Sequence, residues 1–395
     1  MKHTNRCPSV ATPTAGPVLR SQRALAPDLA RGAMLLFIAL ANAANFAFAG
    51  QPGIDGTPHG LQRMVNFFMI TFVDSRAYPV FAVMFGYGLV QLARRAAAAG
   101  ADPRRILLRR NACLIVFGAI HATLLYFGDF LGAYGIVGII ATLVLLRRGD
   151  RVHRLVMWLW ALLLGFTLVL AAMLVVNAES GHAVLTNTPN PSLAAASYGQ
   201  GILDRLAEWP VHTATVVPFI FIVWLGMWAA RRRILEAPET HQVLLRRTTV
   251  GCLAVTVLGA LPYVLVAAGA LQVDPGTLDA MAYLHAVSGK FGGPGYVALF
   301  GLLAQQFSTG PRRPKIVGAV AALGRRSLSG YLFQSVAWTI VFAPFALDLG
   351  GSTYRAVMAA IVVWTVSVLA ARAMERRRYR GPAERLLRRL TYGRS

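Results

Sequence analysis

Long apolar runs recur along this chain, and short arginine-rich segments separate them. A helix needs roughly 18 or more consecutive apolar residues to cross the hydrocarbon core of a bilayer. Helices suit that environment because they satisfy their backbone hydrogen bonds internally. Only 14% of the residues are charged, compared with about 25% in an ordinary soluble domain. The pattern therefore predicts an all-α fold, a polytopic integral membrane helix bundle.

The apolar runs predict about ten transmembrane helices within a bundle that covers residues 28–372. Before it lies a basic tail rich in Pro, Thr and Ser (1–27), which we expect to be disordered, and after it a basic amphipathic tail (373–395). Segment 64–73 is apolar but short, so we expect a half-helix on or within the outer face. The expected spans are Leu29–Ala49, Tyr78–Ala93, Ala112–Phe127, Leu131–Leu146, Leu155–Val176, Val211–Ala230, Val250–Ala270, Gly295–Phe307, Leu328–Phe345 and Tyr354–Ala371.

Basic residues gather on alternate loops, as the positive-inside rule requires of a bacterial inner-membrane protein. With both termini cytoplasmic, the inner segments hold about 34 of the 39 Lys and Arg residues. The net charge of +23 does not indicate nucleic-acid binding, because the charges flank apolar runs instead of forming one soluble basic surface. We expect the lipid bilayer and a small-molecule substrate as partners, and the sequence leaves the oligomeric state open. The five outer cations are Arg63, Arg76, Arg205, Lys290 and Arg355.

The first span carries a polar stripe. At 100° per residue, Asp28 lies about 60°, Asn42 about 20° and Asn45 about −40° from Arg31 around the helix. Asp28 and Arg31 are also spaced to form an ion pair. Polar side chains facing lipid are costly, so the stripe indicates either an interior binding site or a packing interface between helices.

The span at 328–345 repeats this pattern. Its polar and aromatic residues follow i, i+4, i+7, i+11 spacing and share one face, and the same two interpretations apply. They are Ser327, Tyr331, Gln334 and Trp338.

Two histidines are candidate general bases. His121 lies in an otherwise apolar helix, where it is either a base, a proton relay or a hydrogen-bonded core residue. Asp129 follows about 12 Å further along a straight helix, so we expect a pairing to need another span between them. His59 lies in the first outer loop, upstream of Asp74 and Arg76, and is either a base or a solvated loop residue.

Nothing in the sequence indicates a metal or a bound cofactor. The eight histidines are scattered and form no HxxxH or HxH pair. The three cysteines, Cys7, Cys113 and Cys252, form no CxxC motif and no disulfide framework.

Five segments in register along nearly the whole chain resemble the uncharacterised bacterial membrane family typified by YeiB, domain-of-unknown-function family 418. The segments are RALAPDLARGAMLL (23–36), VDSRAYPVFAVMFGYGL (73–89), GAIHATLLYFGDFLGAYGIVG (118–138), GRRSLSGYLFQS (324–335) and GPAERLLRRLTYG (381–393).

That family is similar to a superfamily of transmembrane acyltransferases that includes heparan-α-glucosaminide acetyltransferase. The resemblance implies transfer of an acyl group from cytoplasmic acyl-CoA to an acceptor on the other side. The enzyme's N-terminal pattern is Asp-x-x-Arg-Gly, an Asn near the outer end of the first span, and a catalytic His in the next loop. Asp28, Arg31, Gly32 and Asn42 match it, and His59 occupies the comparable loop. His121 belongs to the YeiB-like segment.

One hypothesis is therefore an enzyme, an acyltransferase with acyl-CoA as co-substrate. Arg31 and Arg325 would contact the CoA phosphates, Asp28 would hold Arg31, and His59 or His121 would deprotonate the acceptor. The alternative is a proton-coupled transporter or lipid-handling membrane protein, and a structural or regulatory role stays open. The remaining candidate substrate-binding residues are Asn42, Asn45, Asp74, Arg76, Asp129, Tyr331 and Gln334.

Overall fold

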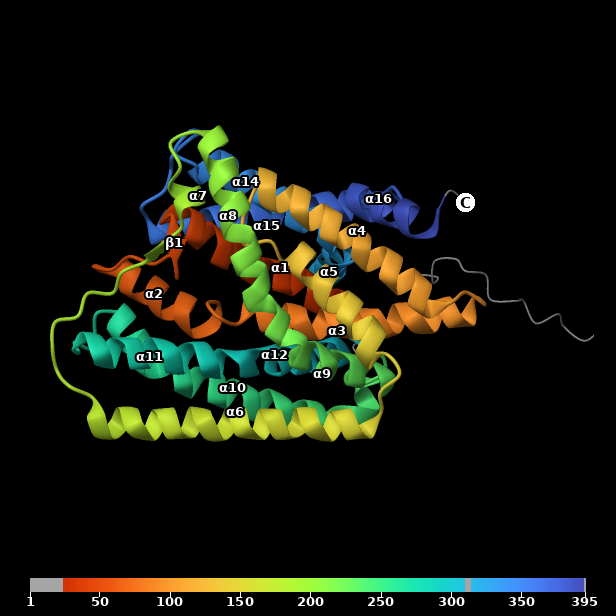
Figure 1. Ribbon diagram of the computed structural model, residues 1–395, viewed down its shortest axis with the longest axis horizontal. Coiled ribbons are helices and arrows are strands. Elements are labelled where there is room, and N and C mark those ends of the chain that lie inside the picture. The colour runs from red at the N-terminus through yellow and green to blue at the C-terminus, as the bar shows by residue number, and fades with distance from the viewer. Residues whose placement is uncertain (1–23, 310–313, 394–395) are drawn as a thin grey trace, which may run out of the picture.

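The computed structural model of the chain describes residues 24–309 and 314–393. The expected disordered tail falls almost entirely outside these residues, as do Cys7, Arg312, Arg313 and Arg394. Figure 1 shows a bundle of helices in which most of the long ones lie roughly along one axis. The two-residue strands β1 (Gly50–Gln51) and β2 (Thr188–Pro189) pair antiparallel and tie two loops together at one end.

The helices cover most of the described residues. In chain order they are α1 (Leu25–Ala47), α2 (Leu61–Phe72), α3 (Ala77–Ala98), α4 (Pro103–Leu124), α5 (Phe130–Ile140), α6 (Asp150–Asn177), α7 (Pro191–Ala194), α8 (Tyr198–Val216), α9 (Ile220–Arg231), α10 (Gln242–Ala267), α11 (Pro275–Ser288), α12 (Gly292–Thr309), α13 (Lys315–Gly324), α14 (Ser327–Phe342), α15 (Thr353–Arg376) and α16 (Pro382–Tyr392).

Seven helical segments of the described chain are long and apolar enough to cross a membrane. This confirms the all-α, multi-pass membrane bundle. The other three of the expected ten spans fall on α5, α12 and α14, which are shorter or less apolar. The seven are Leu25–Ala47, Leu61–Ala98, Pro103–Leu124, Asp150–Asn177, Tyr198–Arg231, Pro238–Ala267 and Thr353–Arg376.

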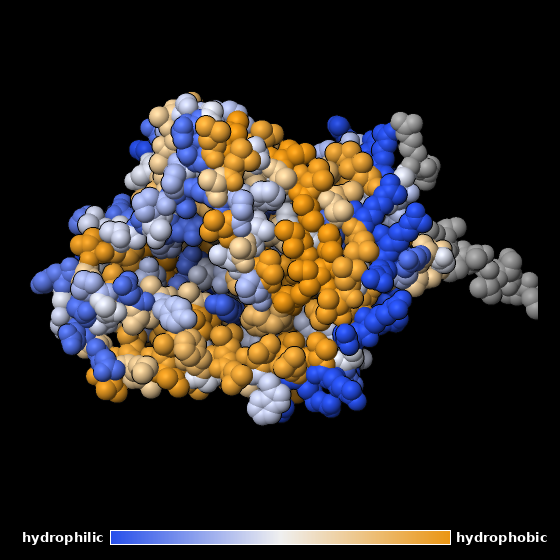
Figure 2. Space-filling model, viewed as in Figure 1, coloured by the Kyte–Doolittle hydropathy of each residue, from blue (hydrophilic) through white to orange (hydrophobic). Residues whose placement is uncertain are grey.

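The surface of the bundle is apolar where a soluble protein would be polar. In α6 the side chain of Trp158 is 69% exposed and that of Val175 is 85% exposed. Figure 2 shows an apolar band across the middle of one face, bordered by strongly hydrophilic residues at the end where α3 finishes and α4 begins. Such a band needs lipid around it, because large exposed apolar patches are unfavourable in water. We call this arginine-rich border, where α3 ends at Ala98 and α4 begins at Pro103, the basic end.

Two regions correct the sequence-based topology, and the first is residues 177–210, expected as a long loop. Its second half is helical, because α8 begins at Tyr198 and continues through a turn of 3-10 helix (Val217–Phe219) into α9. The hydroxyl of Ser197 starts α8 by accepting a hydrogen bond from the backbone N–H of Gln200. Arg205 is not solvated either: it is buried, and its Nε donates to the carbonyl oxygen of Thr123.

The second region is 315–324, which was expected to be part of an inner loop. It forms the buried helix α13, which packs against the start of α1. A Cβ on Gly32 would lie 2.1 Å from the carbonyl oxygen of Val320, so the two backbones touch. The arginines on either side of this segment are typical of a loop. The segment itself is apolar, and it is short enough to pack inside the bundle as a ten-residue helix.

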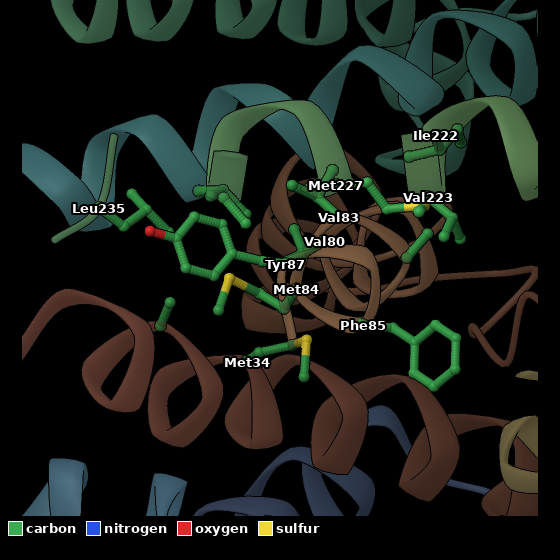
Figure 3. Close-up of a cluster of buried hydrophobic side chains, with 14 of the residues drawn as sticks. Met34, Val80, Val83, Met84, Phe85, Tyr87, Ile222, Val223, Met227 and Leu235 are labelled. Atoms are coloured by element: carbon green, nitrogen blue, oxygen red, sulfur yellow. The ribbon is translucent and has the colours of Figure 1, made fainter. Parts of the chain in front are cut away.

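The largest core joins α1, α3 and α9. Figure 3 shows Met34 of α1 facing Val83 and Met84 of α3, with Met227 of α9 beyond them. The α3–α9 contact is close because a glycine lies on each side. A Cβ on Gly86 would lie 2.0 Å from the carbonyl oxygen of Val223, and one on Gly226 would lie 1.9 Å from that of Val83. These two positions therefore require glycine.

Two helix pairs, α2–α3 and α11–α12, are each interrupted by a short break, and the two breaks lie next to each other. The expected half-helix is α2, and it is separated from α3 by a break at residues 73–76. A turn of 3-10 helix, Gly289–Phe291, separates α11 from α12. The two breaks meet, since a Cβ on Gly289 would lie 2.9 Å from the carbonyl oxygen of Ser75. Interrupted helices that meet inside a bundle expose backbone groups to a shared interior.

Candidate functional site

A continuous cavity of about 1140 Å³ follows α1 from the basic end toward the opposite end. At the basic end its lining carries an excess of cations over anions. Asp28, Glu236 and Glu384 are the acidic residues there, and the arginines are Arg31, Arg94, Arg95, Arg110, Arg233 and Arg325. Six guanidinium groups against three carboxylates make this mouth attractive to an anionic ligand.

Ion pairs order the basic mouth. Asp28 lies between two arginines, with Oδ1 at 3.8 Å from Arg31 and Oδ2 at 3.4 Å from Arg325. The predicted pairing of Asp28 with Arg31 is confirmed. Arg325 also contacts Glu375 at 3.1 Å, and Arg94 contacts Glu236 at 2.6 Å. Over the lining of the mouth as a whole, arginines outnumber carboxylates, which leaves positive charge for a ligand.

The polar stripe of α1 faces this cavity. Asp28, Arg31, Asn42 and Asn45 all line it, which confirms that they share one face directed toward an interior space. Near the end opposite the arginines, the Nδ2 of Asn45 donates to the hydroxyl of Tyr126 at 3.2 Å.

The stripe of α14 is divided between cavity and core. Ser327 and Tyr331 line the cavity. Gln334 lies deeper, where its Nε2 donates to the carbonyl oxygen of Leu35, and Trp338 is fully buried among apolar side chains. Its C-terminal half therefore serves packing.

His121 contacts Ser335 and Asp129 directly. Its Nε2 lies 2.8 Å from the Oγ of Ser335. Its Nδ1 lies 2.9 Å from the Oδ1 of Asp129, at an angle too oblique for a good hydrogen bond. All three side chains are buried, and the ring of Tyr331 stacks at a tilt over the imidazole with 5.0 Å between centroids.

The expectation that another span must separate His121 from Asp129 is wrong. Helix α4 ends at Leu124, and the chain turns back before α5 begins at Phe130. Asp129 is the N-cap of α5, and its Oδ2 accepts a hydrogen bond of 2.6 Å from the backbone N–H of Gly132. The turn, and not a continuous helix, sets the separation.

A second histidine–carboxylate pair occupies the helix breaks. The Nε2 of His285 lies 2.7 Å from the Oδ2 of Asp74, and Asp74 lines the cavity. Arg76 is fully buried, and it donates to the carbonyl oxygens of Asp74 at 2.6 Å and Thr256 at 3.1 Å. Its Nη1 also lies 3.1 Å from the Nδ1 of His285.

Sequence reasoning missed His285 and His212. His285 lies a few residues before the helix-breaking run Gly292-Gly293-Pro294-Gly295, and that position was the available signal. His212 lines the cavity and meets the rings of Phe127 and Phe130 edge-on. His59, by contrast, is exposed in the loop before α2 and is not among the residues lining the cavity.

The predicted site residues therefore fall into three groups. Arg76, His121, Asp129 and Gln334 are buried around the cavity, and His59 lies away from it. Those that line it are Asp28, Arg31, Asn42, Asn45, Asp74, Arg325 and Tyr331. Within the described residues, no group of three His, Cys, Asp or Glu residues is placed to hold a metal ion.

Comparison with known proteins gives a family-model match to the C-terminal part of the chain and relatives that align over nearly its full length. Residues 229–394 match the family described as "Protein of unknown function (DUF418)". The chain is 26% identical to the uncharacterized protein YxaH of Bacillus subtilis (strain 168), with 95% of this chain and 96% of YxaH aligned. It is 26% identical to the uncharacterized protein YeiB of Escherichia coli (strain K12), with 94% and 96% aligned.

A third relative is an uncharacterized 39.9 kDa protein of Bacillus acidopullulyticus, 28% identical over 53% of this chain and 55% of the relative. All three relatives come from bacteria. The matched C-terminal segment and the full-length similarity to YxaH and YeiB show that this multi-pass membrane protein is similar to DUF418 proteins.

Proposed function

We propose that this protein is a membrane acyltransferase that takes an acyl group from acyl-CoA at its basic end and passes it to an acceptor at the opposite end. The observation that carries the proposal is one cavity that joins a cationic mouth to the surroundings of a buried histidine. By the positive-inside rule the basic end is cytoplasmic, where acyl-CoA is available.

The mouth suits the donor. CoA carries several phosphate charges, and guanidinium groups bind phosphate well because they offer paired donors. Arg31, Arg110 and Arg325 line the cavity at this end. From Asp28 to Asn45 the cavity follows α1 for about 25 Å at 1.5 Å per residue, which is enough to seat an extended pantetheine arm.

His121 supplies the proton transfer. Acyl transfer to a hydroxyl or amine needs a base to take the acceptor's proton and an acid to protonate the departing thiolate, and one imidazole performs both. Because the carboxylate of Asp129 lies against Nδ1, the imidazole carries its proton there and Nε2 is the nitrogen that accepts a proton. Burial excludes water that would otherwise hydrolyse the thioester.

Thermal shift of the detergent-purified protein with acetyl-CoA and longer acyl-CoAs tests the donor site. We expect saturable stabilisation that Arg31→Gln weakens and Arg63→Gln retains, because Arg63 is exposed on α2 and away from the cavity lining. Folded wild-type protein that gains no stability from any acyl-CoA would refute the proposal.

One observation favours a second candidate, a proton-coupled transporter. The breaks α2–α3 and α11–α12 meet at Asp74, Arg76 and His285, and interrupted helices line many transport sites. Uptake into proteoliposomes that follows a pH gradient, is independent of CoA and is lost in Asp74→Asn would support transport over acyl transfer.

A further inference from the structure

Ser335 differs from several other buried hydroxyl residues in the helices of the bundle. In a helix, such hydroxyls usually donate to the carbonyl oxygen four residues earlier. Thr142, Thr167 and Ser367 do so at 2.6, 2.7 and 2.8 Å. Ser335 lies 3.4 Å from its carbonyl partner at Tyr331 and 2.8 Å from the Nε2 of His121. The Oγ of Ser335 is therefore closer to the imidazole of His121 than to the carbonyl oxygen that usually accepts from such a hydroxyl.

With the hydroxyl of Ser335 as the donor in this contact, the proton arrangement of the imidazole follows. An imidazole that accepts a proton from Ser335 at Nε2 must carry its own proton at Nδ1, and Nδ1 faces the Oδ1 of Asp129 at 2.9 Å. The negative charge of this carboxylate, close to Nδ1 although not in line for a good hydrogen bond, favours both this tautomer and the imidazolium that forms when the serine proton moves. Ser335 on α14 thus has the role of a nucleophile, and His121 on α4 that of its base. Asp129, the N-cap of α5, orients the base.

The acceptor cannot use Nε2 while Ser335 occupies it. If His121 acted directly on an acceptor, its proton-accepting nitrogen would need to face the cavity, but Oγ of Ser335 is already there. Ser335 and not the acceptor is therefore the first group that His121 deprotonates.

From these contacts we infer that Ser335 is a catalytic nucleophile that carries the acyl group as a covalent ester between donor and acceptor. This inference rests on the proposed acyltransferase function and adds a double-displacement mechanism to it.

The first half-reaction acylates the enzyme. Ser335 Oγ attacks the thioester carbonyl carbon, and its proton passes to His121 Nε2. The carbon–sulfur bond then breaks, and His121 returns the proton to the CoA thiolate, which leaves as the free thiol.

The second half-reaction consumes the ester. A hydroxyl or amine of the acceptor attacks the acyl carbon, His121 takes the acceptor's proton, and Ser335 Oγ leaves and recovers a proton from His121. The net exchange is an acyl group for a hydrogen between CoA and the acceptor.

Tyr331 controls access to this serine. It lies one helical turn before Ser335, lines the cavity, and covers the imidazole of His121 with its ring. Because Ser335 is only 1% exposed, the thioester reaches Oγ when the Tyr331 side chain swings toward the cavity.

Exchange between isotopically labelled CoA and unlabelled acetyl-CoA, without an acceptor, tests the inference. A covalent intermediate permits this exchange, whereas direct transfer does not. We expect exchange in wild type and at least a thousandfold loss in Ser335→Ala, with activity kept in Ser367→Ala, a matched buried serine on α15. Mass spectrometry of rapidly denatured protein should find one acetyl group on the peptide containing Ser335.

The outcomes separate this inference from the proposed function. Stabilisation by acetyl-CoA without exchange, or acetylation of a residue other than Ser335, would overturn the serine while leaving the donor site in place. A wild-type protein that acyl-CoA does not stabilise would overturn both. Ser335→Cys retains a nucleophile, so acylated cysteine would support the inference if Ser335→Ala proved unfolded.

Discussion

Replacing Asp129 by Asn should separate the structural role of this residue from its effect on His121. Asp129 uses Oδ2 to cap α5 at Gly132 and Oδ1 to face the Nδ1 of His121. An asparagine that keeps its oxygen on the backbone N–H of Gly132 must turn its NH₂ toward His121. The imidazole then accepts at Nδ1 and carries its proton at Nε2, where it can no longer deprotonate Ser335.

The expected magnitudes differ for the two roles. Asn and Asp are nearly equal as N-caps, so Asp129→Asn should change stability by well under about 1 kcal/mol, whereas Asp129→Ala should cost about 1 kcal/mol or more. A wrong histidine tautomer lowers serine-triad rates by roughly 10⁴-fold, about 5 kcal/mol in barrier. The assay is acceptor-free CoA exchange beside thermal unfolding. Exchange near the wild-type rate in a folded Asp129→Asn protein would refute the tautomer argument.

Three further predictions concern stability. Arg76→Met removes two charge-assisted hydrogen bonds to carbonyl oxygens, so we expect the free energy of unfolding in denaturant to fall by about 3 kcal/mol or more. Arg63→Met, at an exposed arginine, is the near-neutral control, and an equal loss in both variants would contradict the prediction. Gly226→Ala places a Cβ 1.9 Å from a backbone oxygen and should lower the free energy of unfolding by about 1–3 kcal/mol. The control Gly165→Ala lies on α6 with open space around it and should leave stability unchanged. Equal melting temperatures of the two variants would disprove the contact. Glu384→Ala removes the carboxylate that accepts the N–H groups of Leu328 and Ser329 in the first turn of α14, so limited proteolysis should release α16 faster. An unchanged cleavage rate would show that α16 is held by other contacts.

The membrane fold could be predicted because its determinants are local. A long apolar run and the arginines at its end specify a span without reference to the rest of the chain. Helix α13 and the part of α8 before Pro210 were missed for the same reason. In α13 a short apolar segment lies between arginines, and in α8 the residues before Pro210 are polar enough to suggest a loop. Their helical state depends on packing against neighbours, which hydropathy does not contain.

The candidate site was predictable only within single helices. The 3.6-residue period placed Asp28, Arg31 and Asn42 on one face, and the cavity lies along that face. Contacts between helices were not accessible in this way. Ser335 meets His121 across 214 positions of sequence, and His285 meets Asp74 across 211. Such pairs depend on the arrangement of the whole bundle, which no periodicity encodes.

The glycine-to-backbone contact between α3 and α9 determines which wall of the cavity is able to yield. With main chain touching main chain at Gly86 and Gly226, no side chain remains there to change rotamer and absorb a shift. The two helices should therefore behave as one stiff plate. If the proposed acyl transfer takes place here, acyl chains of different length have to be accommodated where α14 presents the rotatable ring of Tyr331, and we expect selectivity for chain length to depend on that side of the cavity.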